Sequence, residues 1–179
     1  MAGEIVPDDK NWTWVLEKSC GDCGFDAPSF VVAETAEMVR KIAACWVSVL
    51  DRTDVRDRPR PGVWSPLEYA CHVRDVFRIM DARLALMLEG DGPEFENWDQ
   101  DATAVEDDYA AQDPPVVASE LTAAADVFAA RYSTVSGDQW GRHGTRSDGS
   151  VFTVESLARY MLHDPLHHLW DVGEALPAV

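Results

Sequence analysis

Apolar residues recur every three or four positions in four segments of the chain, the spacing that predicts amphipathic helices. The first segment runs over residues 30–50 and the third from Asp113 to about residue 135. The second, residues 66–89, follows Ser65 as N-cap, has Pro66 as its first residue, and contains Glu68 to complete a capping box. The fourth covers residues 154–172 after Thr153. With no convincing buried strand, the pattern predicts an all-α fold, a four-helix bundle.

The segments between the predicted helices are polar. Residues 91–112 form a long acidic connection whose weak periodicity predicts one short helix over 102–111, and connections of this length often carry function. The turn-rich residues 136–152 predict a short hairpin about Asp148-Gly149. No linker divides the chain. We expect a single domain, residues 1–179, in which residues 1–28 form an N-terminal extension that packs on the bundle.

The charge of the chain argues against two classes of partner. Its 15 Lys and Arg residues against 32 Asp and Glu give a formal net charge of −17. Such a chain repels a phosphate backbone or an anionic membrane, so we expect neither nucleic acid nor membrane as a partner. The first ten residues lack a signal-peptide pattern, and no apolar run reaches the roughly 18 residues of a spanning helix. We expect a cytoplasmic protein with a small-molecule substrate, and a homodimer is an open alternative.

The motif HDPLHH, residues 163–168, contains three of the five histidines of the chain. His163 and His167 are four residues apart, so they share one helix face and can bind one metal ion. A third ligand must come from another element, and His72, in the middle of the second predicted helix, is the candidate. The alternative is that each is an ordinary half-buried histidine. Pro165 either kinks the last helix or ends and restarts it, and apolar periodicity on both sides favours the kink.

These motifs resemble the DinB/YfiT-like metalloenzyme superfamily, which is related to the N-terminal domain of mycothiol-dependent maleylpyruvate isomerase. The matching segments are residues 63–88 with His72 and residues 152–172 with His163 and His167. The acidic residues 97–114 are similar to the connection in a branch close to mycothiol-dependent enzymes. The resemblance spans about residues 12–172. The resemblance implies a four-helix bundle with a bound divalent ion, zinc or nickel. In several branches of the family it also implies transfer or isomerisation chemistry that uses a low-molecular-weight thiol such as mycothiol.

Three histidines around one ion would leave a coordination position open. An ion there would activate a thiol or a water for attack on a small electrophile. Asp75 and Asp171 lie three and four residues beyond His72 and His167, so they are candidates for orienting the ligands or contacting substrate. The alternative for each of these two aspartates is an ordinary solvated charge on a helix face. Trp98 and Tyr109, in the acidic connection, are candidates for the wall of a cleft.

Cys20 and Cys23 have the spacing of a zinc knuckle, but the chain has no second CxxC motif. Three interpretations are open: two free thiols, part of a second metal site, or a redox-sensitive pair. A closed four-ligand metal site would need further ligands from Cys45, Cys71 or His143. The sequence thus favours a metal-dependent thiol transferase or hydrolase. The alternative is a non-catalytic, stress-related protein that binds a metal or a small molecule.

Overall fold

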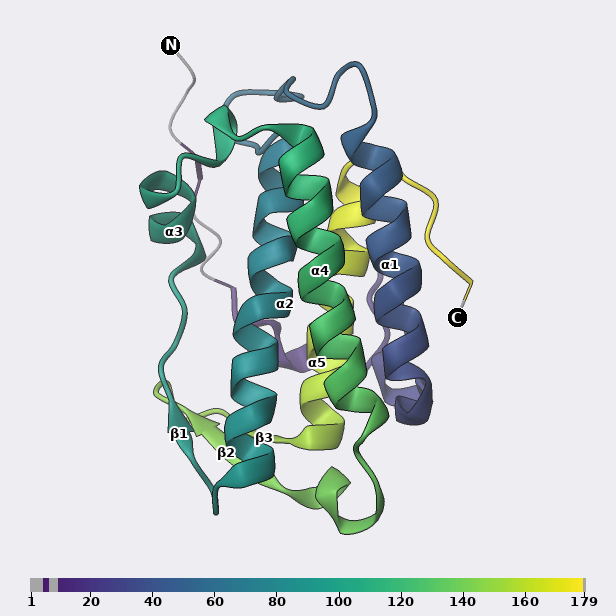
Figure 1. Cartoon of the computed structure of the whole chain (residues 1–179), viewed down its shortest axis with the longest axis vertical. Helices are drawn as coiled ribbons and strands as arrows, with labels where there is room; N and C mark the ends of the chain where they lie inside the picture. The colour runs from purple at the N-terminus through teal and green to yellow at the C-terminus, as the bar shows by residue number, and fades with distance from the viewer. Residues whose placement is uncertain (1–4, 7–9, 179) are drawn as a thin grey trace.

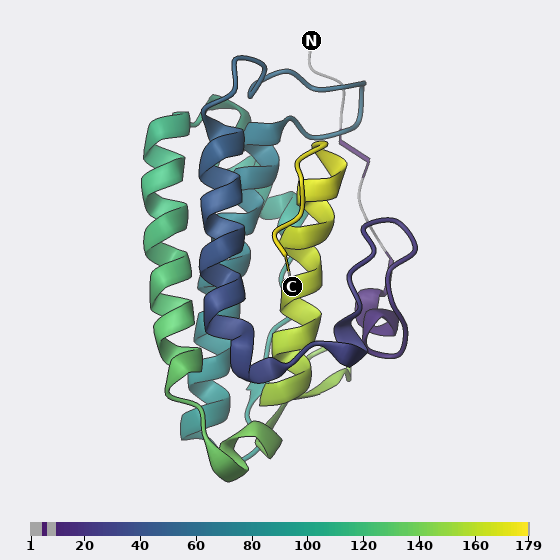
Figure 2. The same cartoon turned by 90° about the vertical axis from the view of Figure 1, so that its right-hand side faces the viewer.

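Four long helices form the body of the protein in a computed structural model that describes residues 5, 6 and 10–178. They are α1 (Thr35–Leu50), α2 (Pro66–Glu89), α4 (Pro114–Ser133) and α5 (Val154–Asp171) (Figure 1). Helix α4 packs against α1 and α2, and α5 packs against the same two helices from the opposite side (Figure 2). The predicted four-helix bundle is confirmed.

The acidic connection after α2 determines the direction of the helices. It contains β1 (Glu94–Phe95), α3 (Gln100–Glu106) and the 3-10 turn η4 (Tyr109–Ala111), so the predicted short helix is two shorter elements. The connection returns the chain to the end of the bundle at which α2 begins (Figure 1). As a result α2 and α4 run in the same direction, and α1 and α5 run the opposite way.

Local capping signals predicted two helix starts correctly. Helix α2 begins with the expected capping box, in which the Ser65 N–H donates to Glu68 Oε2 over 2.8 Å. Helix α5 begins after Thr153, whose side chain accepts from the Ser156 N–H. Helix α1 begins five residues later than predicted, because the 3-10 turns η2 (Ala27–Ser29) and η3 (Val32–Glu34) precede it. Val31, which lies inside the predicted span of the first helix, is instead in the segment before α1 and is 57% exposed.

A small sheet covers one end of the bundle. The predicted hairpin joins β2 (His143–Arg146) to β3 (Val151–Thr153), with Gly149 at a φ of +89° in the turn, and the 3-10 turn η5 (Gly137–Gly141) precedes it. Strand β1 pairs in parallel with β2, which the sequence pattern did not indicate. Gly144 permits this pairing, because a Cβ there would lie 2.7 Å from the Phe95 ring.

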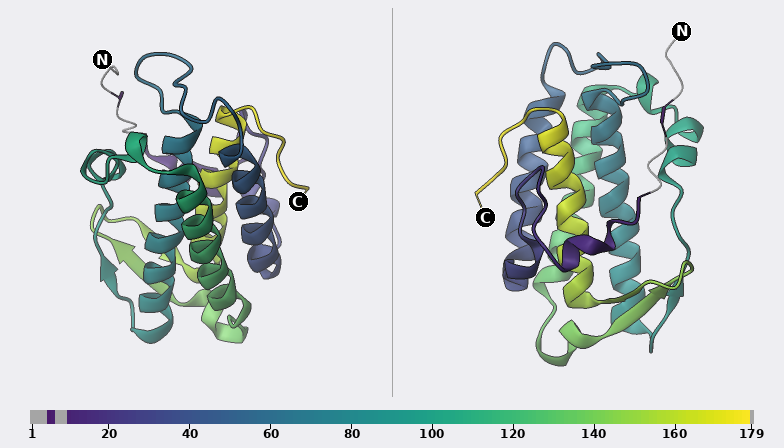
Figure 3. Two further views of the ribbon diagram at one scale, coloured as in Figure 1. Left: turned by 45° about the horizontal axis from the view of Figure 1, so that its top comes forward. Right: turned by 180° about the vertical axis from the view of Figure 1, so that it is seen from behind.

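Helix α5 and the N-terminal segment, residues 10–30, lie together. The α-helix continues through Pro165, so the alternative of an interrupted helix is wrong. The 3-10 turn η1 (Trp12–Leu16) packs across α5 on the outside of the bundle (Figures 2 and 3). Within residues 5, 6 and 10–178, no helix combines the length and the apolar character needed to cross a bilayer.

Candidate metal centres and pocket

The motif HDPLHH places two chelating pairs on neighbouring stripes of α5. Consecutive residues of a helix differ by about 100° in direction, so the pairs 163/167 and 164/168 face different surroundings. Two groups of potential ligands result, each with donor atoms within 4.8 Å of one another. The cysteine–histidine cluster consists of Cys20, Cys23, His163 and His167, and the pocket triad consists of His72, Asp164 and His168.

The predicted trio is therefore divided. His163 and His167 lie with the CxxC motif, whereas His72 lies with the neighbouring pair on α5. The reason is geometric: α2 packs beside the stripe of α5 that carries residues 164 and 168, and the N-terminal segment packs beside the other stripe.

All four residues of the cysteine–histidine cluster are buried, with exposures between 3 and 9%. Cys20 Sγ lies 3.5 Å from His167 Nδ1. His163 Nε2 is buried and has no hydrogen-bond partner among the described residues. Burial lowers the pKa of His163 to about 4 and also lowers that of His167, while it raises the pKa of Cys23 to about 11. Both imidazoles are therefore neutral at pH 7, the form that binds a metal.

A tight loop directs the two thiols toward α5. The Cys20 N–H donates to the carbonyl of Phe25 over 2.9 Å, and the Gly24 N–H donates to the carbonyl of Cys20 over 3.0 Å. Gly24 has a φ of +76°, a conformation that favours glycine. This backbone turn brings both thiols to one side of the loop, where the histidines of α5 lie.

The pocket triad is centred on the carboxylate of Asp164. His72 Nε2 lies 3.1 Å from Asp164 Oδ1, and His168 Nε2 lies 3.9 Å from the same oxygen. The opposite nitrogen of His168, Nδ1, lies 2.8 Å from Asp171 Oδ2, which orients the ring. Trp98 stacks on His72, with ring centroids 5.3 Å apart and planes 6° from parallel.

Asp164 is ionised in this setting. Burial would raise the pKa of its carboxyl, but the neighbouring His72 and His168 outweigh that effect and hold the pKa below its ordinary value. The triad thus offers one carboxylate and two imidazoles.

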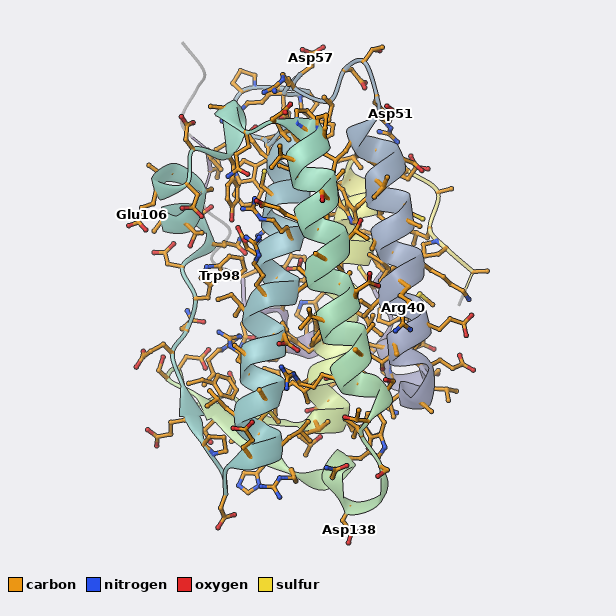
Figure 4. All side chains as sticks on the ribbon, in the orientation of Figure 1. Arg40, Asp51, Asp57, Trp98, Glu106 and Asp138 are labelled. Atoms are coloured by element: carbon orange, nitrogen blue, oxygen red, sulfur yellow. The ribbon has the colours of Figure 1, made fainter. Side chains whose placement is uncertain are left out.

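A pocket of about 410 Å³ lies beside the triad. Its walls come from α2, α5, the N-terminal segment, the acidic connection and the β2–β3 hairpin. They include Trp12, Trp98 and, from α5, both Asp164 and His168 of the triad and His163 and His167 of the cysteine–histidine cluster. Trp98 lines this pocket, and Figure 4 shows it on the connection beside α2.

Two buried arginines line the same pocket. Arg83 is 6% exposed and donates to the carbonyl of Glu96 over 2.9 Å, and no carboxylate lies within 4.0 Å of its guanidinium in the described part of the chain. Burial and the nearby Arg146 lower the pKa of Arg83 to about 10, so it stays charged at pH 7. Arg146 pairs with Asp148 at 2.7 Å, yet its Nε is buried without a partner among these residues. Four aspartates also line the pocket: Asp99, Asp101, Asp148 and Asp164. The charge of Arg83 is not offset by an ion pair in the described part of the chain, so it favours an anionic group on a ligand.

Two other candidates lie away from both groups. The carboxylate of Asp75 contacts Arg74 at 2.8 Å and Arg78 at 3.0 Å, and it accepts a 2.6 Å hydrogen bond from the Tyr109 hydroxyl. Tyr109 is only 1% exposed. These contacts fasten the acidic connection to α2. Asp171, by contrast, contacts His168 closely and lies 4.0 Å from His167 Nε2.

Sequence reasoning missed Asp164, His168, Arg83 and Arg146. The sequence did contain a signal for Asp164 and His168. These residues are also four apart, and carboxylates, like imidazoles, are metal ligands. No local signal pointed to the arginines, since the pocket that gives them a role is formed by segments distant in the sequence.

Comparisons with known proteins agree with this architecture. The family model of the DinB superfamily matches residues 35–172. The chain is similar to the structure of YfiT from Bacillus subtilis, described as "a probable metal-dependent hydrolase with an unusual four-helix bundle topology". The TM-score is 0.70 at 17% identity, over 97% of this chain and 96% of that one, a likeness that shows the fold. No curated protein matches the sequence. The family match includes His72 and HDPLHH but begins after Cys20 and Cys23.

Proposed function

We propose that this chain, which belongs to the DinB superfamily, is a divalent-metal-dependent enzyme that acts on a small anionic molecule. The observation that carries the proposal is the position of the pocket triad. Two imidazoles and an ionised carboxylate converge beside a 410 Å³ pocket, which Asp164 and His168 line and which two buried arginines line as well.

The triad fits a divalent ion by the chemistry of its donors. Two imidazoles and one carboxylate suit zinc, nickel, iron or manganese. Asp171 holds His168 with Nε2 toward the triad, and a carboxylate on the far nitrogen is the usual partner of a metal-binding histidine. Zinc or nickel, the ions that the sequence resemblance implies, both suit this set.

An ion held by these ligands would supply Lewis-acid chemistry, which lowers the pKa of water and polarises a carbonyl oxygen. The other side chains position the substrate. Arg83 and Arg146 bind its anionic group, and Trp98 keeps the His72 ring in place by stacking. The N-terminal segment covers one side of the pocket through Trp12 and restricts the access of bulk water.

The size of the pocket favours water as the nucleophile. A volume of about 410 Å³ is at the lower end of the range for small-molecule sites. It suits one small substrate and a water better than a substrate together with a thiol such as mycothiol. Hydrolysis is therefore the first candidate reaction, and transfer to a thiol is the second.

Hydrolysis of paired chromogenic esters tests this proposal. The full chain, purified without a histidine tag and loaded with zinc or nickel, is assayed with 4-nitrophenyl hemisuccinate and with the neutral 4-nitrophenyl acetate. We expect faster metal-dependent hydrolysis of the anionic ester and loss of that rate in His72→Ala. His143→Ala is the control, because His143 is exposed and lies outside both ligand groups.

The same assay separates the alternatives. Turnover that requires an added low-molecular-weight thiol and yields a thiol adduct would replace hydrolysis with thiol transfer. A His72→Ala protein with unchanged metal content and unchanged rate would refute the proposal.

A further inference from the structure

We propose that Cys20, Cys23, His163 and His167 form a second, closed zinc site that fastens the N-terminal segment to α5. This site is distinct from the pocket triad and does not depend on the reaction at the pocket. Its two halves are a CxxC loop near the start of the chain and a helical HxxxH pair near its end.

The donor atoms fit a tetrahedral zinc ion. Zinc–sulfur and zinc–nitrogen bonds of about 2.3 and 2.0 Å place neighbouring donors of a tetrahedron roughly 3.3 to 3.8 Å apart. All four donors here lie within 4.8 Å of one another, and the Cys20–His167 pair, at 3.5 Å, has the required separation. The other pairs would have to shorten by at most about 1.5 Å. The C-x2-C and H-x3-H spacings are also those of closed Cys2His2 sites.

Charge distinguishes this site from the pocket triad. Two thiolates neutralise a divalent ion, so a complete Cys2His2 site has no net charge and is compatible with the burial of all four ligands. The triad has three ligands with a single carboxylate, so an ion there keeps a positive charge and an open coordination position. The first arrangement is structural and the second is suited to chemistry.

A simple thiol pair explains less of the geometry. A disulfide would involve the sulfur atoms alone, and free thiols would engage only His167, through the 3.5 Å contact from Cys20 Sγ. In both cases His163 would have no role. His163 Nε2 in particular is buried without a hydrogen-bond partner among the described residues, which is costly unless a ligand is bound. A zinc ion accounts for the cysteines and the histidines together.

The zinc site would support the pocket. Trp12 packs against both histidines of the cluster, with ring centroids 5.3 Å from His163 and 5.2 Å from His167. Lys10, Asn11 and Trp12 also line the pocket. The N-terminal segment lies across α5 on the face seen from behind in Figure 3. Fixing this segment to α5 therefore fixes one wall of the pocket.

Cobalt substitution of the full chain tests the site without an activity assay. We expect reduced, untagged protein to bind Co²⁺ with a thiolate-to-cobalt charge-transfer band in the near ultraviolet, which zinc abolishes by displacement. Cys23→Ser should weaken the band strongly. Cys45→Ser is the matched control, because Cys45 is partly buried and lies outside the cluster. His72→Ala should keep the band, which separates this site from the pocket triad.

X-ray absorption on the zinc-loaded wild type gives a second readout that needs no variant to fold. We expect two sulfur neighbours at about 2.3 Å for the ion in this site. A wild-type protein with no charge-transfer band and no sulfur neighbours around zinc would overturn the proposal. So would a Cys20–Cys23 disulfide that persists in zinc-containing, reducing buffer.

Discussion

The hydrogen bond from Tyr109 to Asp75 gives a quantitative test of how the acidic connection is held. Tyr109→Phe removes a buried hydroxyl that donates to a carboxylate oxygen over 2.6 Å, and it leaves the ring in place. A hydrogen bond to a charged group contributes about 1.5–3 kcal/mol to stability. Asp75 keeps its contacts with Arg74 and Arg78 in the variant, so the carboxylate is not left unpaired. We expect a loss at the lower end of that range, about 1.5–2 kcal/mol.

Urea unfolding at equilibrium, followed by circular dichroism, measures this loss. Tyr132→Phe is the matched control, because the Tyr132 hydroxyl donates over 3.2 Å to the neutral carbonyl of Val154 and is also buried. A bond between neutral groups contributes about 0.5–1.5 kcal/mol, so the control should lose less. If Tyr109→Phe costs no more than Tyr132→Phe, the inference that the charged acceptor dominates is refuted.

The same variant also tests the placement of Asp75 and Tyr109 outside both ligand groups. We expect the metal content of Tyr109→Phe to equal that of the wild type, measured by elemental analysis of the folded protein. A loss of metal in this variant would mean that the two residues support a metal site after all.

Three further perturbations have definite expected outcomes. Arg83→Met removes a buried guanidinium that has no carboxylate within 4.0 Å in the described part of the chain, so stability in thermal unfolding should stay equal or rise. Calorimetric affinity for hemisuccinate should fall. Lower stability with unchanged affinity would contradict the anion-binding role. Gly144→Ala places a Cβ 2.7 Å from the Phe95 ring and should cost about 1–3 kcal/mol in urea unfolding, and a neutral result would mean that the sheet adjusts freely. Burial would raise the pKa of Glu68, but hydrogen bonds from Arg58 and Ser65 outweigh it and lower the pKa below its ordinary 4.5. The unfolded chain therefore takes up this proton at higher pH than the folded one, so the stabilisation is full above about pH 4.5 and is lost as the pH falls through the folded pKa. Glu68→Gln should accordingly reduce the acid dependence of stability below pH 5, and an unchanged acid profile would contradict this assignment.

Local signals in the sequence were sufficient for much of the fold. The start of α2 depends on Ser65, Pro66 and Glu68, which interact within one helical turn, so the sequence alone specifies it. The hairpin at Asp148-Gly149 is equally local. The start of α1 was predicted too early because apolar spacing continues through the 3-10 turns over residues 27–34, and periodicity does not distinguish such turns from an α-helix.

The ligand groups show the limit of such reasoning. The sequence by itself determined that HDPLHH lies on a helix and that residues four apart share a face, because that geometry belongs to the helix alone. Only the tertiary structure decided which pair faces His72 and which faces Cys20 and Cys23. That choice depends on the rotation of α5 about its own axis, which is set by packing against α1, α2 and the N-terminal segment. Contacts between residues more than 90 positions apart in the chain fix it, and no local pattern records them.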